Sequence, residues 1–101
     1  MIVLKKTCNA CPEQYDAFLD GKMVGYLRLR HGSFTVQCPG YDGRLVYSAT
    51  PRGDGIFEHD ERDFYLRHAV KAIEDWNAGR EPEAPNVQYK IEELYSADEI
   101  D

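Results

Sequence analysis

The sequence predicts an α+β fold, in which a mainly antiparallel β-meander sheet of about five to six strands carries one long helix on one face. Apolar residues alternate at a period of two in short stretches between residues 15 and 50, with glycine turns between the stretches. From residue 60 the apolar period changes to three or four residues, as in an amphipathic helix. A chain of 101 residues holds one hydrophobic core, so we expect a single domain over residues 1–94 and an acidic tail over 95–101.

The predicted strands follow one another with a turn signal after most of them. Residues 2–7 are predicted to form a first strand, either at an edge of the sheet or as a lid. The next strand ends at Asp20-Gly21, which is a strong hairpin signal, and leads into a strand over 23–31 with Leu27 and Leu29 on one face. Two further strands, over 34–38 and 45–50, complete the meander, and in the second of them Leu45, Tyr47 and Ala49 alternate with polar or smaller neighbours.

A helix is predicted from Asp60 to Ala78, with Gly79 as its stop signal. Its Lys71 and Asp75 are four residues apart and are expected to pair on the exposed side. After a proline-rich connector, the alternation over residues 87–91 predicts a last strand, which can join the sheet parallel to a neighbour. The helix is expected to turn these residues toward the core: Tyr65, Leu66, Ala69, Ile73 and Trp76.

The net charge of -6 is distributed unevenly. Residues 1–80 contain eleven acidic and eleven basic side chains, whereas residues 81–101 contain seven acids and only Lys90. More acids surround the predicted helix start. Such surfaces repel nucleic acid and favour basic partners, so we expect no direct contact with nucleic acid but binding to a host protein with a basic surface. The residues expected to make this contact are Asp54, Glu58, Asp60, Glu61, Asp63, Glu92, Glu93, Asp98 and Glu99.

Apolar runs and cysteines bear on location and metal binding. No apolar run approaches the ~18 residues of a membrane span, and the opening run is short for a signal peptide, so we expect a cytoplasmic protein. Cys8-x-x-Cys11 and Cys38 could supply three thiolates to zinc, with His31, His59 or an acid as the fourth ligand. A second C-x-x-C pair is missing from the sequence. Free thiols are therefore the preferred interpretation, and no metal or cofactor is assigned.

The segment Arg52-Gly53-Asp54-Gly55 lies between a predicted strand and the predicted helix. A strand, an Arg-Gly-x-Gly loop and a helix after an antiparallel meander resemble the acyl-CoA pyrophosphate loop of GNAT-type N-acetyltransferases. The resemblance implies a cofactor contact at Arg52, Gly53 and Gly55, where backbone N–H groups and a helix start hold phosphates. This chain lacks the two helices that follow the first strand in that family, and Glu58 and Asp60 would repel a pyrophosphate.

A broader resemblance covers residues 11–16, 20–22, 24–32 and 34–36, and extends through Gly53-Asp54-Gly55. These segments resemble small uncharacterised proteins encoded by bacteriophages and prophages, which implies an accessory role in the cytoplasm of a bacterial host cell. Together with the charge pattern, this leads us to expect a non-enzymatic protein that binds a host macromolecule. One form would be an inhibitor of a defence nuclease or CRISPR complex, of the anti-CRISPR or nucleic-acid-mimic type. The alternative is an acyl-CoA-binding or N-acetyltransferase-like protein.

Overall fold

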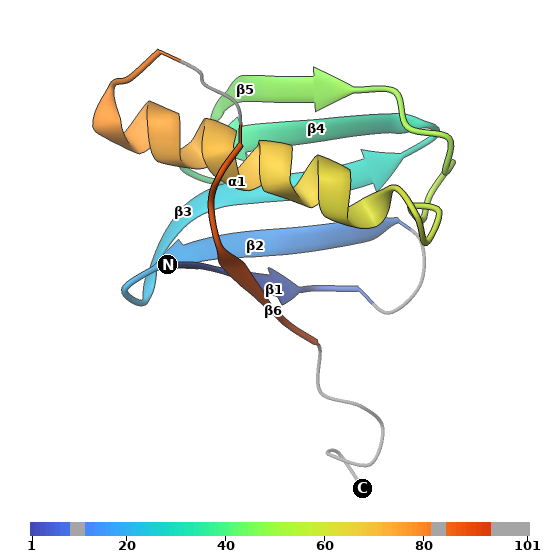
Figure 1. Ribbon diagram of the computed structural model, residues 1–101, viewed down its shortest axis with the longest axis horizontal. Coiled ribbons are helices and arrows are strands. Elements are labelled where there is room, and N and C mark those ends of the chain that lie inside the picture. Colours follow the sequence, from blue (N-terminus) through green and yellow to red (C-terminus); the bar gives the residue numbers. More distant parts are fainter. Residues whose placement is uncertain (9–11, 82–84, 94–101) are drawn as a thin grey trace, which may run out of the picture.

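The computed structural model describes residues 1–8, 12–81 and 85–93, and the predicted α+β fold is confirmed. Six strands form one sheet in the order β5-β4-β3-β2-β1-β6, and the helix α1 lies across one face of it (Figure 1). The elements are β1 (Ile2–Lys6), β2 (Glu13–Leu19), β3 (Lys22–Arg30), β4 (Ser33–Cys38), β5 (Arg44–Ala49), α1 (Arg62–Ala78) and β6 (Tyr89–Glu92). The predicted tail, residues 95–101, lies outside the described residues. In the described part of the chain, no helix has the length and apolar character needed to cross a membrane.

The first five strands form an antiparallel meander in which each strand pairs with the next. The chain then crosses the sheet through α1 and returns at the opposite edge. There β6 pairs parallel with β1, with Ile2 opposite Tyr89 and Leu4 opposite Ile91. The predicted edge position of the first strand is therefore wrong: β1 lies between β2 and β6, because the last strand of the chain covers its free side.

Two hairpin turns have positive φ at both central residues. The turn between β2 and β3 has φ of 52° at Asp20 and 82° at Gly21, and the turn between β3 and β4 has 53° at His31 and 75° at Gly32. Positive φ at both positions is the geometry of two-residue hairpins whose twist matches that of the strands. The predicted turn at Asp20-Gly21 is confirmed.

The core lies between the sheet and α1. The helix approaches the sheet closely at Gly25, where a Cβ atom would lie 2.7 Å from Cδ1 of Ile73. A bulge beside Ala17 shifts the register of β3, so Val24 and Gly25 are both buried, whereas strict alternation would expose one of them. The buried apolar side chains are Ile2, Leu4, Tyr15, Ala17, Val24, Leu27, Leu29, Phe34, Val36, Cys38, Phe57, Leu66, Ala69, Val70 and Ile73.

One helix residue lies elsewhere than predicted. Leu66, Ala69 and Ile73 are fully buried, and Tyr65 packs half-buried against them, but Trp76 is 40% exposed. The last turn of α1 projects past the adjacent ends of β4 and β5 in Figure 1, so little of the sheet covers this side chain. The helical period alone does not show where the sheet beneath a helix stops.

Candidate functional site

In the turn between β5 and α1, several backbone N–H groups donate hydrogen bonds to the carboxylate of Glu61, at the end of the same turn. Glu61 is only 7% exposed, and its Oε1 accepts a 2.9 Å hydrogen bond from the N–H of Arg52. Its Oε2 accepts hydrogen bonds of 2.9 Å from the N–H groups of Gly53 and Glu58. A Cβ atom on Gly53 would lie 2.0 Å from the carbonyl oxygen of Ile56, so this close turn requires glycine.

Glu61 is ionised at neutral pH. Burial alone would raise the pKa of Glu61, but hydrogen bonds from backbone N–H groups and the charge of Arg52 outweigh burial and lower the pKa. The carboxylate thus places a negative charge where the glycine loop would otherwise offer its donors to a phosphate. A pyrophosphate bound at Arg52 and Gly53 would have to displace Glu61.

A second buried carboxylate, that of Glu13 at the start of β2, links the turn to the sheet through hydrogen bonds. Glu13 is 1% exposed and accepts hydrogen bonds from the N–H of Phe57 at 3.0 Å, from Nε of Arg62 at 2.8 Å and from the hydroxyl of Tyr15. Its own N–H donates to the carbonyl oxygen of Gly55 at 2.7 Å. Burial would raise the pKa of Glu13, but these hydrogen bonds lower it. Burial and the Glu13 charge raise the pKa of Tyr15, so its phenol remains a donor.

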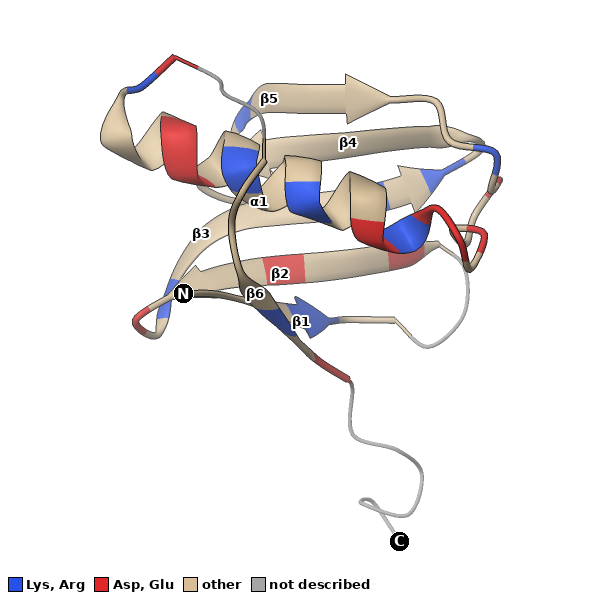
Figure 2. Ribbon diagram, viewed as in Figure 1, with Lys and Arg blue, Asp and Glu red and all other residues tan. Residues whose placement is uncertain are grey.

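The outer side of this turn presents charged and apolar side chains together. Asp54, Glu58 and Asp60 are exposed, and Figure 2 shows their carboxylate-bearing segment leading into α1. In the same stretch of sequence, Ile56 is 45% exposed, and Phe64, in the first turn of α1 and packed against the ring of His68, is 54% exposed. We call the three acids together with Ile56 and Phe64 the acidic turn. Protein-binding surfaces commonly combine exposed apolar side chains with polar ones.

The predicted acids do not form one continuous surface. Glu61 is turned inward, and Asp98 and Glu99 lie outside the described residues. Glu92 and Glu93 belong to the β6 edge of the sheet, apart from the acidic turn in Figure 2. Five of the predicted acids lie beside bases. Asp60 and Glu61 lie beside Arg52, Asp63 lies 2.8 Å from Arg67, Glu92 lies 3.9 Å from Lys5, and Glu93 lies 3.6 Å from Lys6.

The cysteines of the possible zinc site are only partly described. Cys38 is buried in the core, and burial raises its pKa to about 11, so it is a protonated thiol at neutral pH. Cys8 is half-buried, and Cys11 lies outside the described residues. Within the described ranges, no three His, Cys, Asp or Glu side chains gather closely enough to hold a metal ion.

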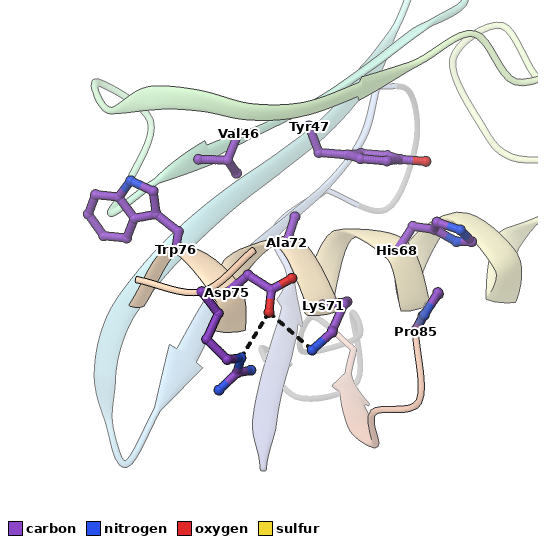
Figure 3. Close-up of a pocket in the computed structure, with 9 residues that line it drawn as sticks. Val46, Tyr47, His68, Lys71, Ala72, Asp75, Trp76 and Pro85 are labelled. Atoms are coloured by element: carbon purple, nitrogen blue, oxygen red, sulfur yellow. Dashed lines mark hydrogen bonds and ion pairs between the residues drawn. The ribbon is translucent and has the colours of Figure 1, made fainter. Parts of the chain in front are cut away.

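A groove of about 350 Å³ lies between β5 and the second half of α1 (Figure 3). Sequence reasoning missed this groove because a bulge near Val36 shifts the register of β5. The bulge brings both Val46 and Tyr47 against the core, whereas Leu45, predicted to share the face of Tyr47, is 56% exposed. The lining residues are Val46, Tyr47, His68, Lys71, Ala72, Asp75, Trp76, Arg80 and Pro85.

The polar side of the groove is centred on Asp75, which is 4% exposed. Its Oδ1 lies 3.0 Å from Nζ of Lys71 and accepts a 3.2 Å hydrogen bond from Nε of Arg80. Its Oδ2 is buried and has no hydrogen-bond partner among the described residues. The predicted pair of Lys71 and Asp75 thus exists, but its predicted exposure is wrong, because the side chains are only 13% and 5% exposed beside the groove.

No protein-family model, curated protein or solved structure matches this chain. The resemblances to phage-encoded proteins and to N-acetyltransferases therefore stay predictions.

Proposed function

We propose that the chain is a non-enzymatic binding protein that docks its acidic turn onto a basic surface of another protein. The observation that carries the proposal is that Ile56 and Phe64 are exposed in the same short segment as exposed carboxylates, and that Glu13 and Glu61 fix the backbone of this segment through hydrogen bonds. A turn that is already ordered loses little conformational freedom on binding, so more of the contact energy appears as affinity.

The carboxylates and the apolar side chains of the acidic turn have different roles in the proposed interface. Arg52 pairs with Asp60, so the net negative charge of the turn is smaller than its number of acids. Carboxylates at the rim of an interface mainly steer association and exclude wrong partners. Phe64 and Ile56 would then supply most of the affinity, as buried apolar anchors do in other interfaces.

The partner class that fits this surface is a nucleic-acid-binding protein in the cytoplasm of a bacterial host. Such a protein exposes Arg and Lys side chains that normally neutralise phosphates, and carboxylates on a fixed turn compete for the same side chains. The phage resemblance supports this class, to which a defence nuclease or a CRISPR complex belongs. Occupation of the nucleic-acid channel would inhibit such a partner without any chemical step.

The acyl-CoA alternative has less support from the geometry. The N–H groups of Arg52 and Gly53, which would have to hold a pyrophosphate, already donate to Glu61. The exposed Glu58 and Asp60 stand beside the same backbone and add repulsion.

The proposal is tested with a purified partner. The tagged chain is incubated with a bacterial lysate, and the retained protein is identified by mass spectrometry, purified separately and mixed with the chain. We expect a stoichiometric complex whose affinity for nucleic acid is at least about tenfold lower than that of the free partner. A complex that binds nucleic acid as tightly as the free partner would contradict the proposed competition.

A further inference from the structure

The side of the sheet opposite to α1 is uncovered. In Figure 1 α1 lies on the near side of the sheet, and no second helix of the described residues covers the far side. We call this far side the open face, and its centre is formed by Gln14, Tyr26, Arg28, Arg30, Thr35 and Gln37. We propose that the open face binds a short single-stranded nucleic acid. This contact goes beyond the proposed function and does not use the acidic turn.

The alternation of β3 places two arginines on the open face. Leu27 and Leu29 are fully buried in the core beneath α1. Successive side chains of a strand point to opposite sides of the sheet, so Arg28 and Arg30 project from the other side. Among the described residues, neither arginine has an ion pair with an acid. An unpaired guanidinium is free to hold a phosphate through two parallel hydrogen bonds.

The charges of the sheet differ from those of the whole chain. The net charge of the chain is -6, but β3, β4 and β5 together contain no acid and four bases, Lys22, Arg28, Arg30 and Arg44. The acids of the open face are Asp16 on β2 and Glu92 on β6, and Glu92 already lies 3.9 Å from Lys5. The expectation from the net charge, that the chain does not contact nucleic acid, therefore does not extend to this face.

Two tyrosines stand beside the arginines. Tyr26 is two residues before Arg28 on the same side of β3, and its hydroxyl donates a 3.2 Å hydrogen bond to Oε1 of Gln14. Tyr41, between β4 and β5, is 67% exposed and meets Tyr26 edge to face, with ring centroids 6.0 Å apart. Exposed aromatic rings beside bases of the protein are the surfaces on which unpaired nucleobases stack.

The combination of groups favours a single strand over other anions. Arg28 lies opposite Gln14 and Thr35 in the sheet, and Thr35 lies opposite Ser48, so neutral hydrogen-bonding side chains continue the row. An acidic peptide would pair with the arginines but would bring no flat rings to the tyrosines. A duplex has phosphates, but its bases are stacked on one another. A single strand offers phosphates and free bases together, and open sheets with aromatic side chains bind single strands in this way.

The test titrates the full chain into labelled single-stranded DNA and RNA of about ten nucleotides, a typical site size, and follows fluorescence anisotropy. We expect saturable binding of at least one of the two strands, at least about tenfold tighter than that of the DNA duplex of the same sequence. The logarithm of the affinity should fall with that of the salt concentration with a slope of about -1.4, the value for two phosphate contacts on a single strand. The proposal is overturned if neither strand binds saturably, if the duplex binds as tightly, or if polyglutamate displaces the strand as effectively as unlabelled strand does.

Two double variants locate the phosphates. Arg28→Gln/Arg30→Gln removes two positive charges from the open face. Lys22→Gln/Arg44→Gln removes two from exposed positions whose neighbours across the strands pack against the core on the side of α1. At about 0.1 M salt, where screening acts over ~10 Å, we expect at least about tenfold weaker binding and a salt slope near zero for the first variant. The second should stay within about threefold of the wild type. Equal losses in the two variants would refute binding on the open face.

A third variant tests the stacking. Tyr41→Ala removes an exposed ring and no charge, so the fold and the salt slope should stay unchanged. We expect the affinity for the single strand to fall by about fivefold or more, which corresponds to the loss of one stacked base. Unchanged affinity in Tyr41→Ala would contradict base stacking on this face.

Discussion

The backbone N–H of Gly53 donates a 2.9 Å hydrogen bond to Oε2 of Glu61, eight residues further along the chain. Glycine loops before helices are associated with bound phosphate because their N–H groups are free to donate. Here the chain supplies the anion itself. The Glu61 carboxylate therefore fixes the backbone of the turn, and the exposed side chains project from this fixed backbone.

Removal of the Glu61 carboxylate should destabilise the protein. Glu61→Ala leaves the N–H groups of Arg52, Gly53 and Glu58 without their acceptor, so we expect the free energy of unfolding in urea to fall by about 1–3 kcal/mol. Glu58→Ala, at an exposed position in the same turn, should change it by no more than about 0.5 kcal/mol. Equal losses in the two variants would show that Glu61 has no special structural role.

The stability of the protein should decrease in acid. Glu13 and Glu61 have pKa values below the ordinary 4.5, so the stability that they contribute is fully present above that pH and is lost as the pH falls through the lowered pKa values. We expect the free energy of unfolding to fall as the pH decreases below 4.5, and to fall less in the double variant Glu13→Gln/Glu61→Gln. An identical pH slope in the double variant would disprove this assignment.

Asp16 should act in the opposite direction. Burial raises the pKa of Asp16 above 3.8, so protonation relieves an unfavourable charge and adds stability as the pH falls. Asp16→Asn removes that gain, and its free energy of unfolding should therefore decrease more steeply in acid than that of the wild type. Urea unfolding at the same series of pH values checks this, and a shallower decrease in Asp16→Asn would contradict it.

Gly53 should not tolerate a side chain. A Cβ atom there would lie 2.0 Å from the carbonyl oxygen of Ile56, so Gly53→Ala must distort the turn, and we expect a loss of about 2–3 kcal/mol in thermal or urea unfolding. Gly40 offers a matched control, because the nearest atom to its added Cβ is the Cε of Met23 at an ordinary 3.7 Å. If Gly53→Ala lowered the free energy of unfolding less than Gly40→Ala, the backbone at Gly53 would have to be able to move aside for a Cβ atom, which would contradict a fixed turn.

Acetyl-CoA should not stabilise the protein. A ligand present at a hundred times its dissociation constant stabilises the folded state by about 2.7 kcal/mol, which a thermal unfolding assay detects readily. Because Glu61 already accepts from the N–H groups of Arg52 and Gly53, we expect no change in Tm at millimolar acetyl-CoA. A saturable increase in Tm would restore the acyl-CoA alternative.

Much of the fold could be predicted because its signals are local. The turn at Asp20-Gly21 and the helix stop at Gly79 depend on backbone conformations that glycine favours, and both are present, with φ of 82° at Gly21 and 65° at Gly79. The position of β1 inside the sheet could not be predicted, because it depends on pairing with β6 at the other end of the chain. The two bulges that change which residues are buried likewise depend on partner strands.

The candidate site was only partly visible in the sequence. The sequence indicates the acids around residue 58, but their spacing does not distinguish Glu61, whose side chain points inward, from Asp60, whose side chain is exposed. Glu13 is an ordinary strand residue in the sequence, and its contact with Arg62 joins positions 49 residues apart. Long-range contacts of this kind appear only once the chain is folded.

The most direct measurement for the proposed function is the affinity of the purified partner for two charge-reversed variants. Glu58→Lys/Asp60→Lys alters the acidic turn, and Asp42→Lys/Glu81→Lys makes the same change of net charge at exposed positions outside it. We predict that titration calorimetry will show at least about tenfold weaker binding for the first variant and a change within about twofold for the second. Equal dissociation constants for the two variants would contradict binding through the acidic turn.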